Sequence, residues 1–142
     1  MYILVSGCLL GIACRYDGKS KPYTPVIELM KKHNLIPFCP EVIGGLPTPR
    51  PPAEVVGDKV LTQKGSDVTK QYKKGAEEAL RIAKLYKCKY AILKEKSPSC
   101  GSGTIHNGKF DGGLIQGDGI TVRLSKENGI IVLGESEIEK II

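Results

Sequence analysis

The sequence predicts a single α/β domain, residues 1–142, built on a mostly parallel, doubly wound sheet of about four to five strands. Short apolar runs alternate along the chain with segments of helical periodicity, which is the order of parallel β-α-β units. The length suffices for a real core, since ~150 residues bury about two-thirds of the surface that the unfolded chain exposes. The 41% hydrophobic and 25% charged residues are ordinary for a globular protein, so disordered and coiled-coil classes lack support.

The first part of the chain is predicted to be strand, helix, strand. Residues 1–5 are a continuous apolar run, which indicates a strand buried on both faces. Thr24 and Pro25 are typical of a helix start, an N-cap hydroxyl followed by proline, and the helix is expected to end at Asn34. Residues 35–38 form the next short strand, which a right-handed crossover would place parallel to the first.

The middle of the chain is predicted to be a long irregular loop followed by a long helix. Residues 44–66 hold too many glycines and prolines for regular structure beyond a hairpin around 55–61. Long loops of this kind are usually functional in compact domains. The best helix of the chain is expected at 67–87, with Ser66 and Asp67 at its cap.

The last third of the chain is predicted to return to the sheet twice. Residues 89–94 are a third strand, and 106–119 form a glycine-rich loop. A helix is expected at 120–127, a fourth strand at 130–133, and a short helix at 135–142.

Three cysteines follow directly after predicted strands: Cys8, Cys39 and Cys100. Ligands of a doubly wound sheet bind outside the carboxyl ends of its strands, so the topology predicts that these thiols meet. The odd count of five cysteines favours thiols or metal ligands over disulfides. Since the chain has no CxxC pair, a zinc knuckle and a thioredoxin-like motif both lack support.

Three thiolates from three strand ends suit a [4Fe–4S] cluster, which takes one ligand per iron and would keep one iron open. An open position is typical of a metal centre that binds substrate. Cys14 could supply a fourth thiolate, which would favour an electron-transfer cluster. Inert buried cysteines are the simpler alternative.

Glu41 lies two residues after the second of these cysteines, on the same side of the chain if the segment is extended. A carboxylate beside a cluster could serve as general acid or base. The alternative is an ion pair with one of two arginines, Arg15 or Arg50. Gly44 and Gly45 would let the backbone approach a substrate.

Ser97 and Ser99 come shortly before the third cysteine and offer hydroxyl groups for proton relay or substrate contact. Serines beside proline and glycine are, however, more often turn residues. His106 lies in the glycine-rich loop and is a weaker candidate for the site.

Arg15, Tyr16 and Asp17 come soon after the first cysteine and could orient a polar ring by stacking and hydrogen bonds. The net charge is +6, with basic residues crowded into 70–96, and such a surface attracts anions such as nucleotides or RNA. A solvated helix face explains the same run of basic residues, because glutamates interleave with the lysines.

The sequence shows neither a signal peptide nor an apolar run of ~18 residues. The protein is therefore expected to be cytoplasmic, without membrane contact.

Six short motifs follow one another along nearly the whole chain, at residues 6–11, 14–18, 39–41, 44–50, 67–69 and 97–101. In this order and combination the motifs resemble the thiouracil desulfidase family. The resemblance implies a Rossmann-like domain that holds an oxygen-sensitive [4Fe–4S] cluster by Cys8, Cys39 and Cys100. Cys14 matches a frequent cysteine of that family which is not counted among the ligands.

The resemblance also implies the reaction, in which the open iron takes the sulfur of a thiocarbonyl group and water replaces C=S by C=O. Glu41 matches the catalytic acid, and Ser97 or Ser99 matches a second catalytic residue. The expected substrates are 2- or 4-thiouracil, thiouridine or its nucleotide. Thiolated tRNA is possible but less favoured, because longer relatives with nucleic-acid substrates carry an extra domain.

Two other classes of function remain open from the sequence. One is a non-catalytic iron–sulfur domain for electron transfer or sensing, and the other is a basic RNA-binding domain with structural cysteines. The sequence makes no prediction of the oligomeric state.

Overall fold

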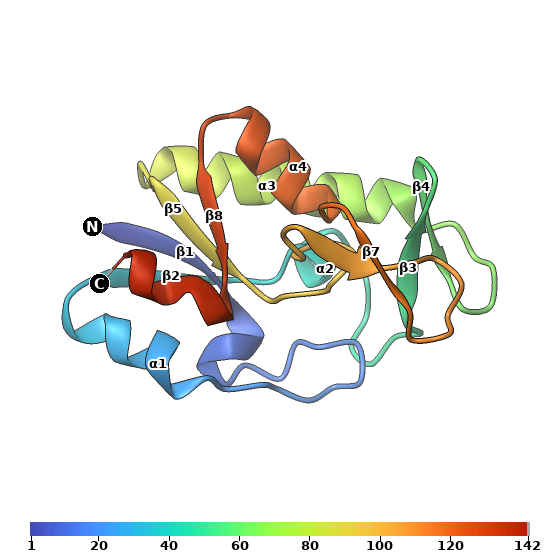
Figure 1. Cartoon of the computed structure of the whole chain (residues 1–142), viewed down its shortest axis with the longest axis horizontal. Helices are drawn as coiled ribbons and strands as arrows, with labels where there is room; N and C mark the ends of the chain where they lie inside the picture. The colour runs from blue at the N-terminus through green and yellow to red at the C-terminus, as the bar shows by residue number, and fades with distance from the viewer. Residues whose placement is uncertain (142) are drawn as a thin grey trace.

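Four parallel strands form the central sheet of the computed structural model, which describes residues 1–141 (Figure 1). The strands are β1 (Tyr2–Ser6), β2 (Asn34–Phe38), β5 (Tyr90–Leu93) and β8 (Ile131–Gly134). Their order across the sheet is β2-β1-β5-β8, and each neighbouring pair is parallel. The predicted α/β class and all four predicted sheet strands are therefore confirmed.

Helices cover both faces of this sheet, as a doubly wound fold requires (Figure 1). One face carries α3 (Thr69–Leu85) and α4 (Ile120–Glu127). The other carries α1 (Thr24–Ile27) and the 3₁₀ helices η2 (Glu28–Lys31) and η3 (Glu135–Lys140). Among the described residues no helix is long and apolar enough to cross a bilayer.

The apolar run of β1 supplies side chains to both layers. Ile3 and Val5 pack with the core under α1, while Leu4 packs with Ala79 and Ala83 of α3. All five are almost fully buried, and each large side chain contributes about 1.5–3 kcal/mol by leaving water. The alanines of α3 permit its close approach to the sheet.

The predicted helix starts differ in detail from those observed. The first helix begins at Thr24, and the N-cap is Tyr23, which makes no side-chain cap bond, so the prediction of a Thr24 cap is wrong. The long helix begins at Thr69. Asp67 Oδ1 still accepts hydrogen bonds from the Thr69 backbone N–H at 2.9 Å and from the Thr69 hydroxyl at 2.6 Å. Asp67 thereby satisfies one of the free donors of the first turn.

Two hairpins extend the fold beyond one end of the sheet. The predicted hairpin is present as β3 (Ala53–Val56) and β4 (Lys59–Thr62). A second, β6 (Thr104–His106) with β7 (Leu114–Gln116), lies where only a glycine-rich loop was predicted. Strands of three residues separated by glycines carry too short an alternation to be recognised in the sequence. β3 and β6 contact each other and together form a wall beside the sheet.

A short helix, α2 (Pro40–Ile43), corrects the prediction that residues 39–41 are extended. Cys39 has extended backbone angles and serves as the N-cap, and Pro40 occupies the first helical position, where its missing N–H costs nothing. Glu41 consequently projects from the first turn of a helix.

This helix packs backbone to backbone on α3, because a Cβ added at Gly75 would collide with the carbonyl oxygen of Pro40. We therefore expect Gly75→Ala to lower the free energy of unfolding by about 1–3 kcal/mol, the cost of overpacking. In an uncrowded helix the same change would instead stabilise by ~1 kcal/mol. Thermal and urea unfolding provide the measurement.

The matched control is Gly117→Ala, whose new Cβ would meet only Ile105, at an ordinary 3.5 Å. It should change the unfolding free energy by no more than about 0.5 kcal/mol. Equal stabilities of the two variants would show that α2 does not depend on this close approach.

Candidate active site

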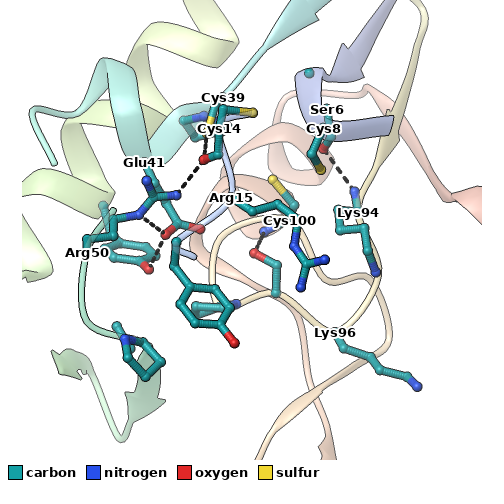
Figure 2. A pocket seen from close by; sticks show the side chains of 18 of the residues that line it. Ser6, Cys8, Cys14, Arg15, Cys39, Glu41, Arg50, Lys94, Lys96 and Cys100 are labelled. Atoms are coloured by element: carbon teal, nitrogen blue, oxygen red, sulfur yellow. Dashed lines mark hydrogen bonds and ion pairs between the residues drawn. The ribbon is translucent and has the colours of Figure 1, made fainter. Parts of the chain in front are cut away.

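A cavity of about 370 Å³ opens at the carboxyl ends of β1, β2 and β5 (Figure 2). This is the point where the chain changes direction across the sheet, since β2 lies on one side of β1 and β5 on the other. Ligands of doubly wound sheets bind at such a switch point, and pockets of roughly 300–1,000 Å³ suit small molecules.

The structure brings Cys8, Cys39 and Cys100 to the lining of this one cavity, together with Cys14 (Figure 2). Cys8 lies in the 3₁₀ helix η1 (Gly7–Leu10), directly after β1. All five cysteines are free thiols, and the fifth, Cys88, is buried in the core under α3. The predicted meeting of the three strand-end cysteines is thus present in the fold.

The donor set fits a cluster better than a single ion. No group of three His, Cys, Asp or Glu side chains within residues 1–141 is placed to hold one metal ion. Thiolates of an iron–sulfur cluster bind different irons, so they surround a wider space than the ligands of one ion do. Cysteine thiols that line one cavity suit this kind of site, since thiolates are soft ligands that select iron–sulfur clusters.

Two of these thiols are held in the protonated form when no metal is bound. Burial raises the pKa of Cys100 to about 12. A hydrogen bond with the Cys14 thiol, followed by burial, raises the pKa of Cys39 well above its usual range. Because cysteine binds a metal as the thiolate, metal binding must release these protons.

Glu41 is held by one of its two carboxylate oxygens. Its Oε1 accepts hydrogen bonds from the Tyr72 hydroxyl at 2.8 Å and from Arg50 Nε at 3.1 Å. No hydrogen bond within the described residues reaches Oε2. Of the two arginines considered from the sequence, Arg50 is therefore the partner, while Arg15 lies 3.9 Å from Asp17. The ion pair leaves one oxygen available for chemistry.

Arg50 ties Glu41 to the neighbouring loops. The side chain is buried and donates to the carbonyl oxygens of Pro47 at 3.2 Å and Cys14 at 2.9 Å, and to the Thr48 hydroxyl at 3.0 Å. The Cys14 carbonyl that accepts from Arg50 also lies 3.7 Å from the Cys39 sulfur (Figure 2). One guanidinium group thus fixes the acid and the loop beside the cysteines.

Tyr72 is a site residue that the sequence did not reveal. It lies on the apolar stripe of α3, where an aromatic side chain indicates core packing, and its hydroxyl emerges at the far end of the ring. Burial, then the charge of Glu41, raises its pKa, so the hydroxyl remains a hydrogen-bond donor at neutral pH.

The two candidate serines differ in position. Ser97 lines the cavity, and its Oγ accepts from the backbone N–H groups of Ser99 at 3.1 Å and Cys100 at 3.0 Å. Among the described residues its own hydroxyl proton has no acceptor, so it can donate to a ligand. Ser99 is fully buried, lies outside the cavity lining, and its Oγ is 2.7 Å from Thr121 Oγ1. The geometry thus favours Ser97 over Ser99.

The predicted substrate contacts are only partly supported by position. Arg15 and Tyr16 line the cavity, whereas Asp17 does not. Gly44 and Gly45 also lie outside the lining. A Cβ at Gly44 would collide with the backbone of α3, so this glycine serves helix packing, and the proposed approach to substrate is not supported by its position.

Four further residues line the cavity: Glu54, Lys94, Lys96 and His106. The sequence did not indicate the first three as site residues, and it offered His106 only as a weaker candidate. Lys94 anchors the end of β5, because its N–H donates to Ser6 Oγ at 2.9 Å and its Nζ pairs with Glu135 at 3.0 Å. Its position at the end of the predicted strand 89–94 was the available signal.

Comparison with known proteins finds relatives along almost the whole chain. Residues 3–137 match the family model described as 2-thiouracil desulfurase. The chain is 43% identical to the uncharacterized protein YbbK of Bacillus subtilis (strain 168), with 99% of both chains covered. It superposes with a TM-score of 0.93 on a solved structure described as the [4Fe-4S]-dependent thiouracil desulfidase TudS, at 47% identity over 98% of this chain and 93% of that one. The chain belongs to the 2-thiouracil desulfurase family.

Proposed function

We propose that the protein is a [4Fe–4S]-dependent desulfidase that replaces the C=S group of a thiolated pyrimidine by C=O. The observation that carries this proposal is that Cys8, Cys39, Cys100 and Glu41 all line one cavity. Family membership and the likeness to TudS support it.

Cys8, Cys39 and Cys100 would hold the cluster, each following the end of a different strand. When bound, such a cluster supplies a soft Lewis acid with one open position, which prefers the sulfur of a thiocarbonyl to oxygen. Arg15 and Tyr16, at the cavity wall, would contact the substrate ring.

Glu41 would act as the general base through Oε2. Since Tyr72 and Arg50 both bind Oε1, the carboxylate is fixed in orientation while its other oxygen can take a proton from water. The activated water attacks the ring carbon that bears sulfur, and the C–S bond then breaks. Ser97 would relay a proton through its free hydroxyl. Water and thiocarbonyl give carbonyl and hydrogen sulfide, so no electrons are transferred overall.

The test is a desulfidation assay without oxygen. Protein reconstituted with iron and sulfide should release sulfide from 4-thiouracil or 2-thiouracil and form uracil in equal amount, whereas metal-free protein should not. Absence of sulfide release from thiouracils, thiouridine and its nucleotide would contradict the proposal.

Cys14 distinguishes this enzyme from an electron-transfer module. Its thiol lines the same cavity as those of Cys39 and Cys8, so it is a candidate fourth ligand. We expect Cys14→Ala to keep the iron content and most of the sulfide release, because the three other thiolates suffice. Iron quantitation and the assay above check this. Loss of the cluster in Cys14→Ala would favour the electron-transfer alternative.

The favoured substrate is a free thiobase or thionucleotide, with tRNA less favoured.

A cytoplasmic location fits the five free cysteines, because oxidising compartments convert such thiols to disulfides.

A further inference from the structure

Two polar side chains on the cavity wall have no part in the reaction described above. Glu54 belongs to β3 and His106 to β6, and both strands lie in the hairpin wall opposite the strand ends. Both side chains line the cavity. Together they form what we term the edge pair, Glu54 and His106.

Glu54 is a buried carboxylate with one oxygen bound and one open. It is 8% exposed, and its Oε1 accepts the backbone N–H groups of Gly108 at 2.8 Å and Phe110 at 3.3 Å. Within residues 1–141 no hydrogen bond reaches Oε2. Because Glu54 lines the cavity and Oε2 is not shielded from solvent, Oε2 can accept a hydrogen bond from a ligand.

His106 supplies the complementary donor. Its Nδ1 is shielded from solvent and has no partner among the described residues. Buried N–H groups without an acceptor are rarer than buried acceptors without a donor, which favours the tautomer with the proton on Nε2. Because the ring lines the cavity and Nδ1 is shielded, Nε2–H is the group that can reach a ligand.

We propose that the edge pair recognises the imide edge of the substrate ring. Glu54 Oε2 accepts the ring N3–H, and His106 Nε2–H donates to the remaining ring carbonyl. This inference rests on the proposed function and deepens it by naming the determinants of base specificity.

The same pair serves both thiouracil isomers. In 4-thiouracil the carbonyl beside N3–H is at C2, and in 2-thiouracil it is at C4, so either ring presents sulfur on one side of N3–H and oxygen on the other. A cytosine-type ring has a lone pair at N3, which would face the Glu54 carboxylate unpaired. Sites that pair a substrate N–H reject analogues that lack it by up to about 10⁴-fold.

Equilibrium binding of the product bases tests this without turnover. Cluster-loaded wild type should bind uracil more tightly than cytosine. In Glu54→Gln the two backbone N–H donors keep the amide oxygen at the Oε1 position, so the NH₂ replaces Oε2. We expect uracil binding to weaken by about tenfold or more and the preference for uracil over cytosine to vanish or reverse. His106→Ala should weaken uracil binding, and His106→Gln, which restores a donor, should recover much of it.

The control is Asn107→Ala, in the same loop, where Asn107 Nδ2 donates to Asp111 at 2.9 Å and Oδ1 accepts from the Lys109 N–H at 2.9 Å, and the side chain does not line the cavity. Its uracil-to-cytosine ratio should equal that of wild type. An unchanged ratio in Glu54→Gln would overturn the proposal. So would equal loss of both bases in Glu54→Gln, because Glu54 would then only hold the loop. Selective uracil binding by a wild type that releases no sulfide would support the edge pair and refute the proposed reaction instead.

Discussion

Cys100→Ser is expected to give a folded protein without an intact cluster and with sulfide release at background. Cys100 is 5% exposed at the cavity wall, and burial raises its pKa to about 12, so its thiol must lose a proton before it can bind a metal at neutral pH. A serine hydroxyl is less acidic still and is a hard ligand, poorly matched to the iron of a cluster. Iron and sulfide quantitation after anaerobic reconstitution, with the visible absorption of the cluster, provides the measurement.

Cys88→Ser is the matched control, because it makes the same chemical change at another buried cysteine. Cys88 packs in the core and does not line the cavity. Its variant should load a full cluster and keep its activity, with a small loss of stability. A full cluster in Cys100→Ser would remove Cys100 from the ligand set, and loss of the cluster in both variants would point to a general folding defect.

Glu41→Gln is expected to lower kcat by about 10²–10⁴-fold, the usual contribution of a general base, while the iron content remains that of wild type. The amide oxygen can still accept from Tyr72 and Arg50, so the side chain keeps its position. The NH₂ that replaces Oε2 cannot take a proton from water. KM should change little, because the substitution removes an interaction of the transition state.

The control is Glu78→Gln, a half-buried residue of α3 outside the cavity lining, where Glu78 pairs with Arg81 at 2.8 Å. It should have wild-type kcat. Two outcomes would contradict the role of Glu41: an unchanged kcat in Glu41→Gln, or loss of the cluster, which would indicate a structural role.

Much of the fold could be predicted from the sequence because its signals are local. Continuous apolar runs marked the four sheet strands, and alternation with helices implied a parallel order. Since parallel strands end at one edge, the meeting of Cys8, Cys39 and Cys100 followed from topology. Local signals were weaker at α2, where proline started a helix instead of continuing an extended segment.

The rest of the site depends on contacts between distant segments, which periodicity does not encode. The position of Tyr72 on the apolar stripe of a helix indicates core packing, whereas in the structure its hydroxyl donates a hydrogen bond to Glu41. Glu54 and His106 meet the cavity only because two short hairpins contact each other at its wall. Ser99 stands beside a cysteine in the sequence, yet its hydroxyl is next to that of Thr121.

The central claim is a cluster-dependent, non-redox replacement of sulfur by water. Reconstituted protein incubated with 4-thiouracil in ¹⁸O-labelled water, without oxygen or any reductant, tests it most directly by mass spectrometry of the product and quantitation of sulfide. We predict uracil that carries one ¹⁸O atom at the former thiocarbonyl carbon, with one sulfide released per uracil formed. Unlabelled uracil, or a strict requirement for an added reductant, would contradict the account.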